Sequence, residues 1–335
     1  MNDAAESRSP GSAGPRPIDS LTAPLSPVGS GSRRPERLAA RRTPAERTLP
    51  AIVRAMRPLQ WTKNAVVLAA LVFDRKLLEP DAVIRALVAV LVFCALSSGV
   101  YLINDVRDAA SDRLHPTKRY RPIAAGELHP RSAIAVAVLL FMVGLATAWI
   151  VRPPFLAVSA GYVALMVLYS LGLKQFIILD VFAIAAGFVL RAAGGAVALT
   201  VTISPWLLVC TMLLALFIGF GKRRHELVAL GHVTDRRKSL SGYSLVFLDQ
   251  LIGTVASATV MAYSIYTFDA SNVPRNHAMM LTIPFVAYAV FRYLFLIHRD
   301  ELSGTPEALL FADRPLLLAI VAWGLSSIAI LQLTG

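Results

Sequence analysis

The chain has 335 residues, of which 56% are hydrophobic and only 16% are charged, and its mean hydropathy is +0.60. This composition excludes a water-soluble globular protein. In a soluble protein the net charge of +12 would indicate nucleic-acid binding, but here the basic residues cluster between apolar blocks. That pattern favours membrane topology, membrane lipids and anionic phosphate ligands, with no nucleic-acid partner.

Residues 1–50 are rich in Pro, Gly, Ser, Ala and Arg and show no apolar periodicity. Such a segment buries too little apolar surface to offset the entropy of ordering, so a disordered cytoplasmic tail is predicted. The rest of the chain, 51–335, contains apolar blocks of about 20 residues, long enough to cross a bilayer as helices. The sequence therefore predicts an all-α polytopic membrane protein with nine spans, at 58–73, 82–104, 131–151, 155–172, 177–199, 205–221, 250–269, 278–297 and 315–333.

The connections after the even-numbered spans carry most of the charge. Since Lys and Arg accumulate on the cytoplasmic side of a plasma membrane, these connections and the N-terminus are expected inside and the C-terminus outside. The basic residues concerned include Arg107, Arg113, Lys118, Arg119, Arg121, Lys174, Lys222, Arg223, Arg224, Arg299 and Arg314.

Polar residues mark the start of the first span. Gln60, Lys63 and Asn64 share one face if this segment is an α-helix, because they are three and four residues apart. Polar groups at bilayer depth indicate the wall of a cavity rather than contact with lipid. We therefore expect these three side chains to bind substrate.

The second span ends in the run N-D-x-x-D-x-x-x-D, formed by Asn104, Asp105, Asp108 and Asp112. Offsets of three and seven residues place the carboxylates on one helix face, where they repel one another unless a cation lies among them. Mg²⁺ prefers one or two carboxylates with substrate phosphates completing its shell. The run predicts a Mg²⁺–diphosphate site, and an acidic helix end solvated in a loop is the alternative.

A basic segment follows the carboxylates. Lys118, Arg119 and Arg121 suit a diphosphate, because arginine forks onto phosphate oxygens and lysine supplies a point charge. The alternative is a solvated loop that obeys the positive-inside rule.

Charged residues also bracket the fifth span. Tyr169, Lys174 and Asp180 surround its start, and Asp180 either complements the helix dipole or binds a metal or sugar hydroxyl. Arg191 lies deep in the apolar zone, so it should face the bundle interior and meet an anion or a carboxylate. An ion pair between Arg191 and Asp180 is the structural alternative.

The sixth span ends in a cationic cluster. Lys222, Arg223 and Arg224 form either a cytoplasmic anchor or a phosphate clamp, with Tyr243 or the basic pair at 236–237 as partners. The polar segment 298–315 is a loop that could cover the cavity.

The chain resembles the UbiA superfamily of intramembrane prenyltransferases over almost all of 50–335. The run at 104–112 and the continuation K-R-Y-R-P-I-A-A-G-E-L at 118–128 carry the resemblance. Within it, R-P-L-Q-W-T-K-N at 57–64, L-R-A-A-G-G-A-V-A at 190–198 and G-K-R-R-H-E-L at 221–227 are most similar to decaprenyl-phosphate phosphoribosyltransferases. One departure is that the second D-x-x-x-D run of aromatic prenyltransferases is reduced here to Asp180.

The resemblance implies a helical bundle around a central cavity open to the cytoplasm. It also implies Mg²⁺-dependent transfer of 5-phosphoribose from phosphoribosyl diphosphate to decaprenyl (polyprenyl) phosphate, in the synthesis of decaprenylphosphoryl arabinose for cell-wall arabinan. Asp105 and Asp108, assisted by Asn104 and Asp112, would hold Mg²⁺, and Lys118 and Arg121 would neutralise the leaving diphosphate. The ribose 5-phosphate or the lipid phosphate would be held by Lys63, Lys174 or Arg191. The alternatives are an aromatic polyprenyltransferase for 4-hydroxybenzoate or a quinone precursor, and a transporter. A homo-oligomer is compatible with the sequence.

Overall fold

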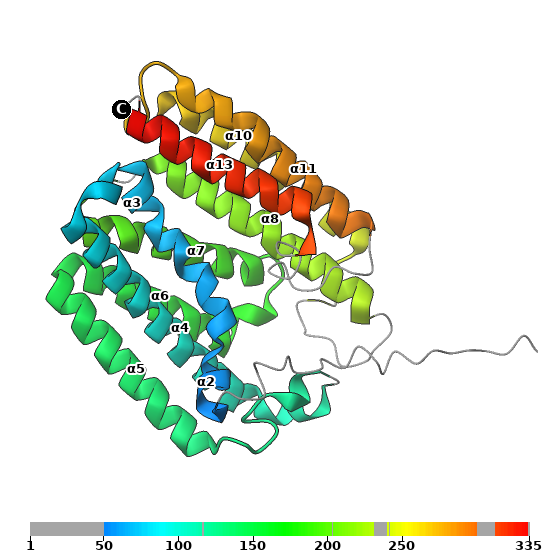
Figure 1. Cartoon of the computed structure of the whole chain (residues 1–335). Helices are drawn as coiled ribbons and strands as arrows, with labels where there is room; N and C mark the ends of the chain where they lie inside the picture. Colours follow the sequence, from blue (N-terminus) through cyan, green and yellow to red (C-terminus); the bar gives the residue numbers. More distant parts are fainter. Residues whose placement is uncertain are drawn as a thin grey trace, which may run out of the picture. The chain divides into compact units, whose positions relative to one another are not determined.

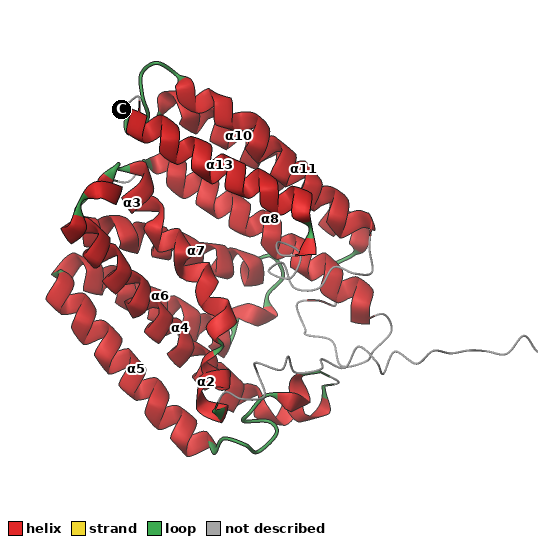
Figure 2. Cartoon of the chain, in the orientation of Figure 1, coloured by secondary structure: helices red, strands yellow, loops and turns green. Residues whose placement is uncertain are grey.

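The computed structural model describes residues 50–115, 117–202, 204–230, 240, 242–299 and 312–333. Within these ranges every regular element is a helix (Figure 2). The predicted tail, the basic pair at 236–237 and most of the polar segment 298–315 lie outside the described residues. The all-α fold expected from composition is confirmed.

Eight helices of the described part are long and apolar enough to cross a membrane. They correspond to the second to ninth predicted spans. The eighth predicted span combines a 3-10 helix, η6 (Ala278–Thr282), with the α-helix α11 that follows it. The helices are α4 (Pro80–Leu114), α5 (Pro130–Val151), α6 (Pro153–Leu171), α7 (Leu179–Leu199), α8 (Pro205–Leu230), α10 (Leu245–Asp269), α11 (Ile283–Arg299) and α13 (Arg314–Leu333).

The first predicted span has a different construction. A short helix α2 (Ala51–Met56) ends at Arg57, whose φ of 56° is left-handed, and the 3-10 helix η2 (Pro58–Leu68) and the short α3 (Ala69–Phe73) follow. A 3-10 helix rises about 2.0 Å per residue against 1.5 Å in an α-helix, so η2 and α3 together extend roughly 30 Å. These 16 residues therefore reach across the apolar layer of a bilayer without forming a long α-helix.

Proline fixes the start of four long helices. Pro80, Pro130, Pro153 and Pro205 are the first residues of α4, α5, α6 and α8, where the missing N–H costs nothing and φ is already helical. Starting at Pro80, the 35 residues of α4 extend about 52 Å, well beyond a hydrocarbon core of about 30 Å. The acidic run therefore lies on a helical extension at one membrane surface.

Helices α4 and α7 form the centre of the bundle. More than half of each span is buried, whereas no more than 28% of the apolar stretch of any other long helix is buried, as expected of helices that face lipid. In Figure 1, α7 lies between α4 and α6 on one side and α8 with α10, α11 and α13 on the other. Small residues allow its close packing, because a Cβ on Gly195 would lie 2.1 Å from the carbonyl oxygen of Val67 in η2.

Candidate active site

The acidic run of α4 meets the loop that follows it. Asp105 and Asp112 are almost fully buried, with 2% and 3% exposure, and Asp108 is half-buried. Arg121, after the short 3-10 helix η4 (Lys118–Tyr120), lies between the two buried carboxylates. Its Nη1 is 3.1 Å from Asp105 Oδ1 and 2.7 Å from Asp112 Oδ2. Arg121 therefore lies beside the carboxylates, and its role toward a diphosphate stays a prediction.

A second arginine reaches the same carboxylate from the N-terminal side. The Arg57 Nη2 donates to Asp105 Oδ1 at 2.5 Å, and its guanidinium lies 4.8 Å from the ring centre of Tyr101. Arg57 is not among the site residues predicted from the sequence. Its left-handed φ and its position between α2 and η2 direct it to α4, and neither feature has a signal in the local sequence.

The third carboxylate binds to another connection. Lys174 in η5 (Leu173–Gln175), between α6 and α7, donates to Asp108 Oδ1 and Oδ2 at 2.8 and 2.9 Å. Arg107, the neighbour of Asp108, donates to the carbonyl oxygens of Ser170 and Leu171 at the end of α6. The end of α4 therefore fixes the α6–α7 connection through two cations.

A divalent cation at this site would take its protein ligands from the acidic run of α4. Among the described residues no three His, Cys, Asp or Glu side chains converge on one point, and each Asp of the run meets a cation instead. Mg²⁺ usually takes only one or two carboxylates and completes its shell with water and phosphate oxygens. Asp105 and Asp108 would therefore be enough as protein ligands of such an ion, and the half-buried Asn104 stays a predicted third ligand.

Two further predicted phosphate ligands precede Arg121 on η4. Lys118 and Arg119 are exposed on η4, and the Arg119 guanidinium lies over the Tyr120 ring at 4.9 Å and donates to its hydroxyl at 2.8 Å. The structure thus separates Arg121, which points at the carboxylates, from the two basic residues before it.

A second charged cluster lies at the start of α7. Asp180 is fully buried and accepts hydrogen bonds from Arg223 Nε of α8 at 2.7 Å and from the Tyr243 hydroxyl at 3.0 Å. Arg223 also donates to Glu226 at 2.5 Å. The pairing of Asp180 with Arg223 shows that the expected alternative, an ion pair between Asp180 and Arg191, is wrong.

The backbone at this cluster is strained. Ile178 has φ 68° and ψ −51°, and the Leu179 N–H donates to the Ile177 carbonyl oxygen at 2.7 Å, which is the pattern of a tight γ-turn rarely adopted by a β-branched residue. The Ile178 N–H donates to the Tyr243 hydroxyl at 2.6 Å. Burial raises the pKa of Tyr243, so the phenol stays protonated and can donate to Asp180.

The other cations in the last part of α8 diverge from this cluster. Arg224 donates to Asp249 Oδ1 of α10 at 2.6 Å and to the Ile297 carbonyl oxygen of α11 at 2.8 Å, and Lys222 is exposed. The predicted clamp of three neighbouring cations is therefore not assembled. Successive residues of a helix point in directions about 100° apart, and here they meet different partners.

Arg191 lies in the bundle interior with 5% exposure, as predicted, but its partners are neutral. It donates to Asn64 Oδ1 and to the Tyr162 hydroxyl, both at 2.7 Å, and its guanidinium lies 4.5 Å from the Tyr162 ring centre. No carboxylate among the described residues lies within ion-pair distance of it. A buried cation without an acidic partner favours a site for an anion.

The remaining predicted residues lie in η2 and near the end of α6. Gln60, Lys63 and Tyr169 are half-buried. Because η2 has three residues per turn, Gln60 and Lys63 align along it and Asn64 points elsewhere, toward Cys94 and Arg191. The expected common face of these three residues is thus limited to two of them.

Solved structures support the fold. The chain is similar to a UbiA homologue from Archaeoglobus fulgidus bound to geranyl diphosphate (GPP) and Mg²⁺, with a TM-score of 0.64, 18% identity, and coverage of 84% of this chain and 99% of the other. At this identity the likeness concerns the fold alone.

Relatives of known name are closer in sequence. The chain is 35% identical to decaprenyl-phosphate phosphoribosyltransferase of Mycobacterium tuberculosis over 281 residues, which are 81% of this chain and 91% of the relative. It is 32% identical to the enzyme of the same name from Corynebacterium glutamicum, over 84% of this chain and 87% of the relative. Residues 65–314 match the model of the UbiA prenyltransferase family. The chain therefore belongs to the UbiA prenyltransferase family of membrane transferases.

Proposed function

We propose that this protein transfers 5-phosphoribose from phosphoribosyl diphosphate to decaprenyl phosphate, or a similar polyprenyl phosphate, and releases diphosphate. The observation that carries the proposal is the alternation of Asp105, Asp108 and Asp112 with Arg57, Arg121 and Lys174 at the end of α4. The identity to decaprenyl-phosphate phosphoribosyltransferases over most of the chain supports it. The product would serve as a precursor of cell-wall arabinan.

The donor is small and highly anionic, and the end of α4 offers both kinds of group that it needs. Asp105 and Asp108, with Asn104 and Asp112 assisting, would hold Mg²⁺, which when bound neutralises the diphosphate and polarises its bond to the ribose. Arg57, Arg121 and Lys174 exchange carboxylate contacts for phosphate oxygens and stabilise the negative charge that develops on the leaving group. The exposed Lys118 and Arg119 lie near enough in sequence to steer the donor toward this end.

The bond changes require no strong base. An anionic oxygen of the lipid phosphate attacks the anomeric carbon of ribose, the bond from that carbon to the diphosphate oxygen breaks, and the electron pair leaves with the diphosphate. In-line displacement inverts the anomeric centre. Arg191, held by Asn64 and Tyr162 inside the bundle, is the residue best suited to hold the acceptor phosphate or the ribose 5-phosphate, because it has no acidic partner among the described residues.

The orientation follows from charge. We place the end of α4 that carries the carboxylates at the cytoplasmic face of the plasma membrane, with the N-terminus inside and the C-terminus outside, since Lys and Arg concentrate at that end. In Figure 1 the chain runs from α2 at one end of the bundle to the C-terminus at the other. Cytoplasmic exposure would give the site access to Mg²⁺ and a soluble phosphorylated donor.

Transfer of label tests the reaction. Purified protein is incubated with decaprenyl phosphate, Mg²⁺ and phosphoribosyl diphosphate labelled in the ribose, and label is expected in the lipid fraction. Lipid that stays unlabelled, together with prenylation of 4-hydroxybenzoate from a prenyl diphosphate, would identify the aromatic prenyltransferase activity instead. Movement of anions into liposomes without any product would identify a transporter.

A further inference from the structure

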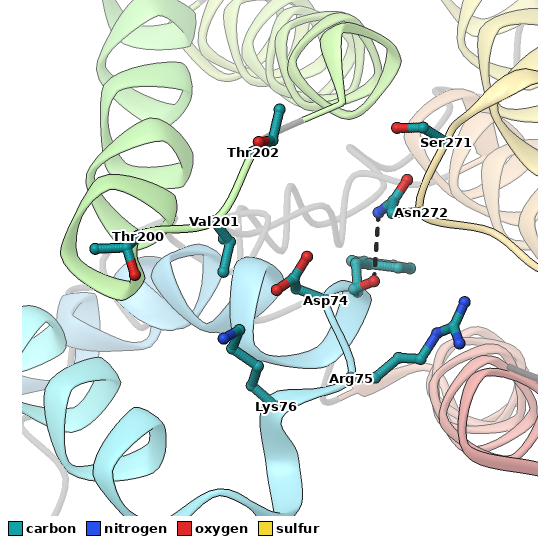
Figure 3. A pocket seen from close by; sticks show the side chains of 9 residues that line it. Asp74, Arg75, Lys76, Thr200, Val201, Thr202, Ser271 and Asn272 are labelled. Carbon is teal, nitrogen blue, oxygen red and sulfur yellow. Dashed lines mark hydrogen bonds between the residues drawn. The ribbon is translucent and has the colours of Figure 1, made fainter.

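A cavity of about 520 Å³ lies at the end of the bundle opposite the carboxylates. Three segments line it: residues 73–76 between α3 and α4, residues 200–202 after α7, and residues 271–272 after α10 (Figure 3). Lys76 lies four residues before the first residue of α4 and Asp105 lies 25 residues after it. Helix rise alone therefore separates this cavity from the acidic run by roughly 40 Å, more than a bilayer core.

The wall of the cavity is polar and carries unmatched hydrogen-bonding atoms. Asn272 donates to the Phe73 carbonyl oxygen and to the Tyr266 hydroxyl, both at 3.3 Å, but its own Oδ1 is buried without a partner among the described residues. A second hollow of about 10 Å³ shares Asp74 and Asn272 with the cavity and is also lined by Ser204. The Ser204 hydroxyl is likewise buried without a partner among the described residues, and the residue is 4% exposed. Buried polar atoms of this kind favour a bound molecule that supplies hydroxyl groups or water.

Two of the three charged residues of the wall lack an ion-pair partner among the described residues. The Asp74 carboxylate and the Arg75 guanidinium form no ion pair with any described residue, and Lys76 makes only a 3.5 Å contact with Glu79. Figure 3 shows Asp74 and Lys76 extending into the space between the three segments. Two cations against one carboxylate give the wall a net positive charge, which selects an anion.

The backbone supports a functional role for this wall. Arg75 and Thr200 have φ of 59° and 61°, in the left-handed region that residues other than glycine avoid, and both line the cavity. Such conformations persist where the surrounding structure maintains them, and they cluster at binding sites. Partial burial raises the pKa of Asp74 and outweighs the opposing effect of the neighbouring Lys76 and Arg75.

We propose that this cavity binds a phosphate-bearing group with free hydroxyls, at the membrane surface opposite the catalytic end. Arg75 and Lys76 bind the phosphate, and Asp74 and the Asn272 Oδ1 accept hydrogen bonds from the hydroxyls. The volume is within the range of small-molecule sites. Both a glycerol-phosphate or glycosyl-phosphate lipid headgroup and the corresponding soluble phosphate have this chemistry. The proposal does not depend on which transfer reaction the other end performs.

Binding to full-length protein tests the site and separates the two sources. The soluble probe is glycerol phosphate, titrated by calorimetry. The lipid probe is phosphatidylglycerol in phosphatidylcholine nanodiscs, with bound lipid counted by native mass spectrometry. The double variant Arg75→Ala/Lys76→Ala should weaken whichever probe binds by about tenfold or more, because it removes two charge-assisted contacts. If this variant loses affinity for phosphatidylglycerol alone, the ligand is a lipid headgroup. If it loses affinity for glycerol phosphate, the ligand is a soluble phosphate.

Two further variants keep the test decisive. Arg275 is an exposed cation in the connection after α10, which also contains Asn272, but it does not line the cavity. Arg275→Ala should therefore change the binding affinity by less than about twofold. Ser204→Ala deletes only the unmatched hydroxyl, so it should leave the melting temperature unchanged and weaken glycerol phosphate but not inorganic phosphate. Wild-type affinity in the Arg75→Ala/Lys76→Ala variant, or an equal loss in Arg275→Ala, overturns the proposal.

Discussion

Lys174 donates to both carboxylate oxygens of Asp108, at 2.8 and 2.9 Å, across 66 positions of sequence. The contact joins the end of α4 to the connection between α6 and α7, and the same connection leads to Ile178 and Asp180. The two charged clusters of this end are therefore linked by one short segment.

Asp108→Ala should lower turnover by about 100-fold or more, because it removes a proposed ligand of the cation that neutralises the leaving diphosphate. Folding should survive, since the Asp108 side chain is 24% exposed. Ser111→Ala, one turn further along α4 and exposed, is the matched control. Steady-state turnover at saturating Mg²⁺ measures the effect, and near-normal activity of the Asp108 variant would exclude the assignment.

Asp105→Ala is a less direct variant, because the same carboxylate receives hydrogen bonds from both Arg57 and Arg121. Removing one partner of a buried ion pair costs about 3–5 kcal/mol, so lost activity and lost stability would be mixed. For this reason Asp108, and not Asp105, is the position to substitute first.

Chelation of divalent metal should abolish transfer and leave the melting temperature of the substrate-free protein nearly unchanged. The carboxylates of the acidic run are already neutralised by Arg57, Arg121 and Lys174, so the fold does not need a metal to offset their repulsion. Activity and thermal unfolding are measured on the same sample with and without chelator. Full activity in the presence of the chelator would contradict the metal-dependent reaction.

Arg191→Lys should raise the KM for the polyprenyl phosphate by about tenfold with a smaller change in kcat, because an ammonium group cannot reproduce the planar fork that contacts Asn64 and Tyr162. Tyr162→Phe removes one neutral partner and keeps the charge, so it serves as the comparison. An unaltered KM for both substrates would show that Arg191 has only a structural role.

Gly195→Ala should prevent normal packing of α7 on η2, because its Cβ would lie 2.1 Å from the Val67 carbonyl oxygen, which belongs to the backbone. A loss of about 1–3 kcal/mol or more is expected from such overpacking. Gly161→Ala in α6 meets no atom within 4 Å and should be neutral or slightly stabilising. The melting temperatures of the two variants in detergent decide whether this contact forms.

The start of α13 should weaken in acid. Arg292 and the Leu316 N–H donate to Asp313, and the hydrogen bond from Arg292 lowers the pKa of this carboxyl below its usual value. A depressed folded-state pKa stabilises the protein above the unfolded pKa, and this contribution is lost as pH falls through the folded value. The melting-temperature difference between the wild type and Asp313→Asn should be constant above about pH 5 and shrink below about pH 4. A difference independent of pH would exclude this pairing.

Much of the fold follows from the sequence because membrane helices satisfy their backbone hydrogen bonds within each segment. Hydropathy therefore locates α4 to α13, and prolines at their first positions set four of the starts. Hydropathy also located the first span but not its helix type. Pro58–Leu68 is a 3-10 helix in which Asn64 contacts Cys94 of α4 and the Val67 carbonyl lies against Gly195 of α7. No local pattern encodes those contacts.

The candidate site divides in the same way. Charge spacing on one helix was enough to identify Asp105, Asp108 and Asp112, because residues three and four apart on a helix are neighbours whatever surrounds them. The choice of cationic partners was decided only by tertiary structure: Arg57, Arg121 and Lys174 come from three connections, Arg223 pairs with Asp180, and Arg191 is left with neutral partners. Ion pairs act over a few ångströms between segments distant in sequence, so composition identifies the charged groups, and helix packing determines which of them meet.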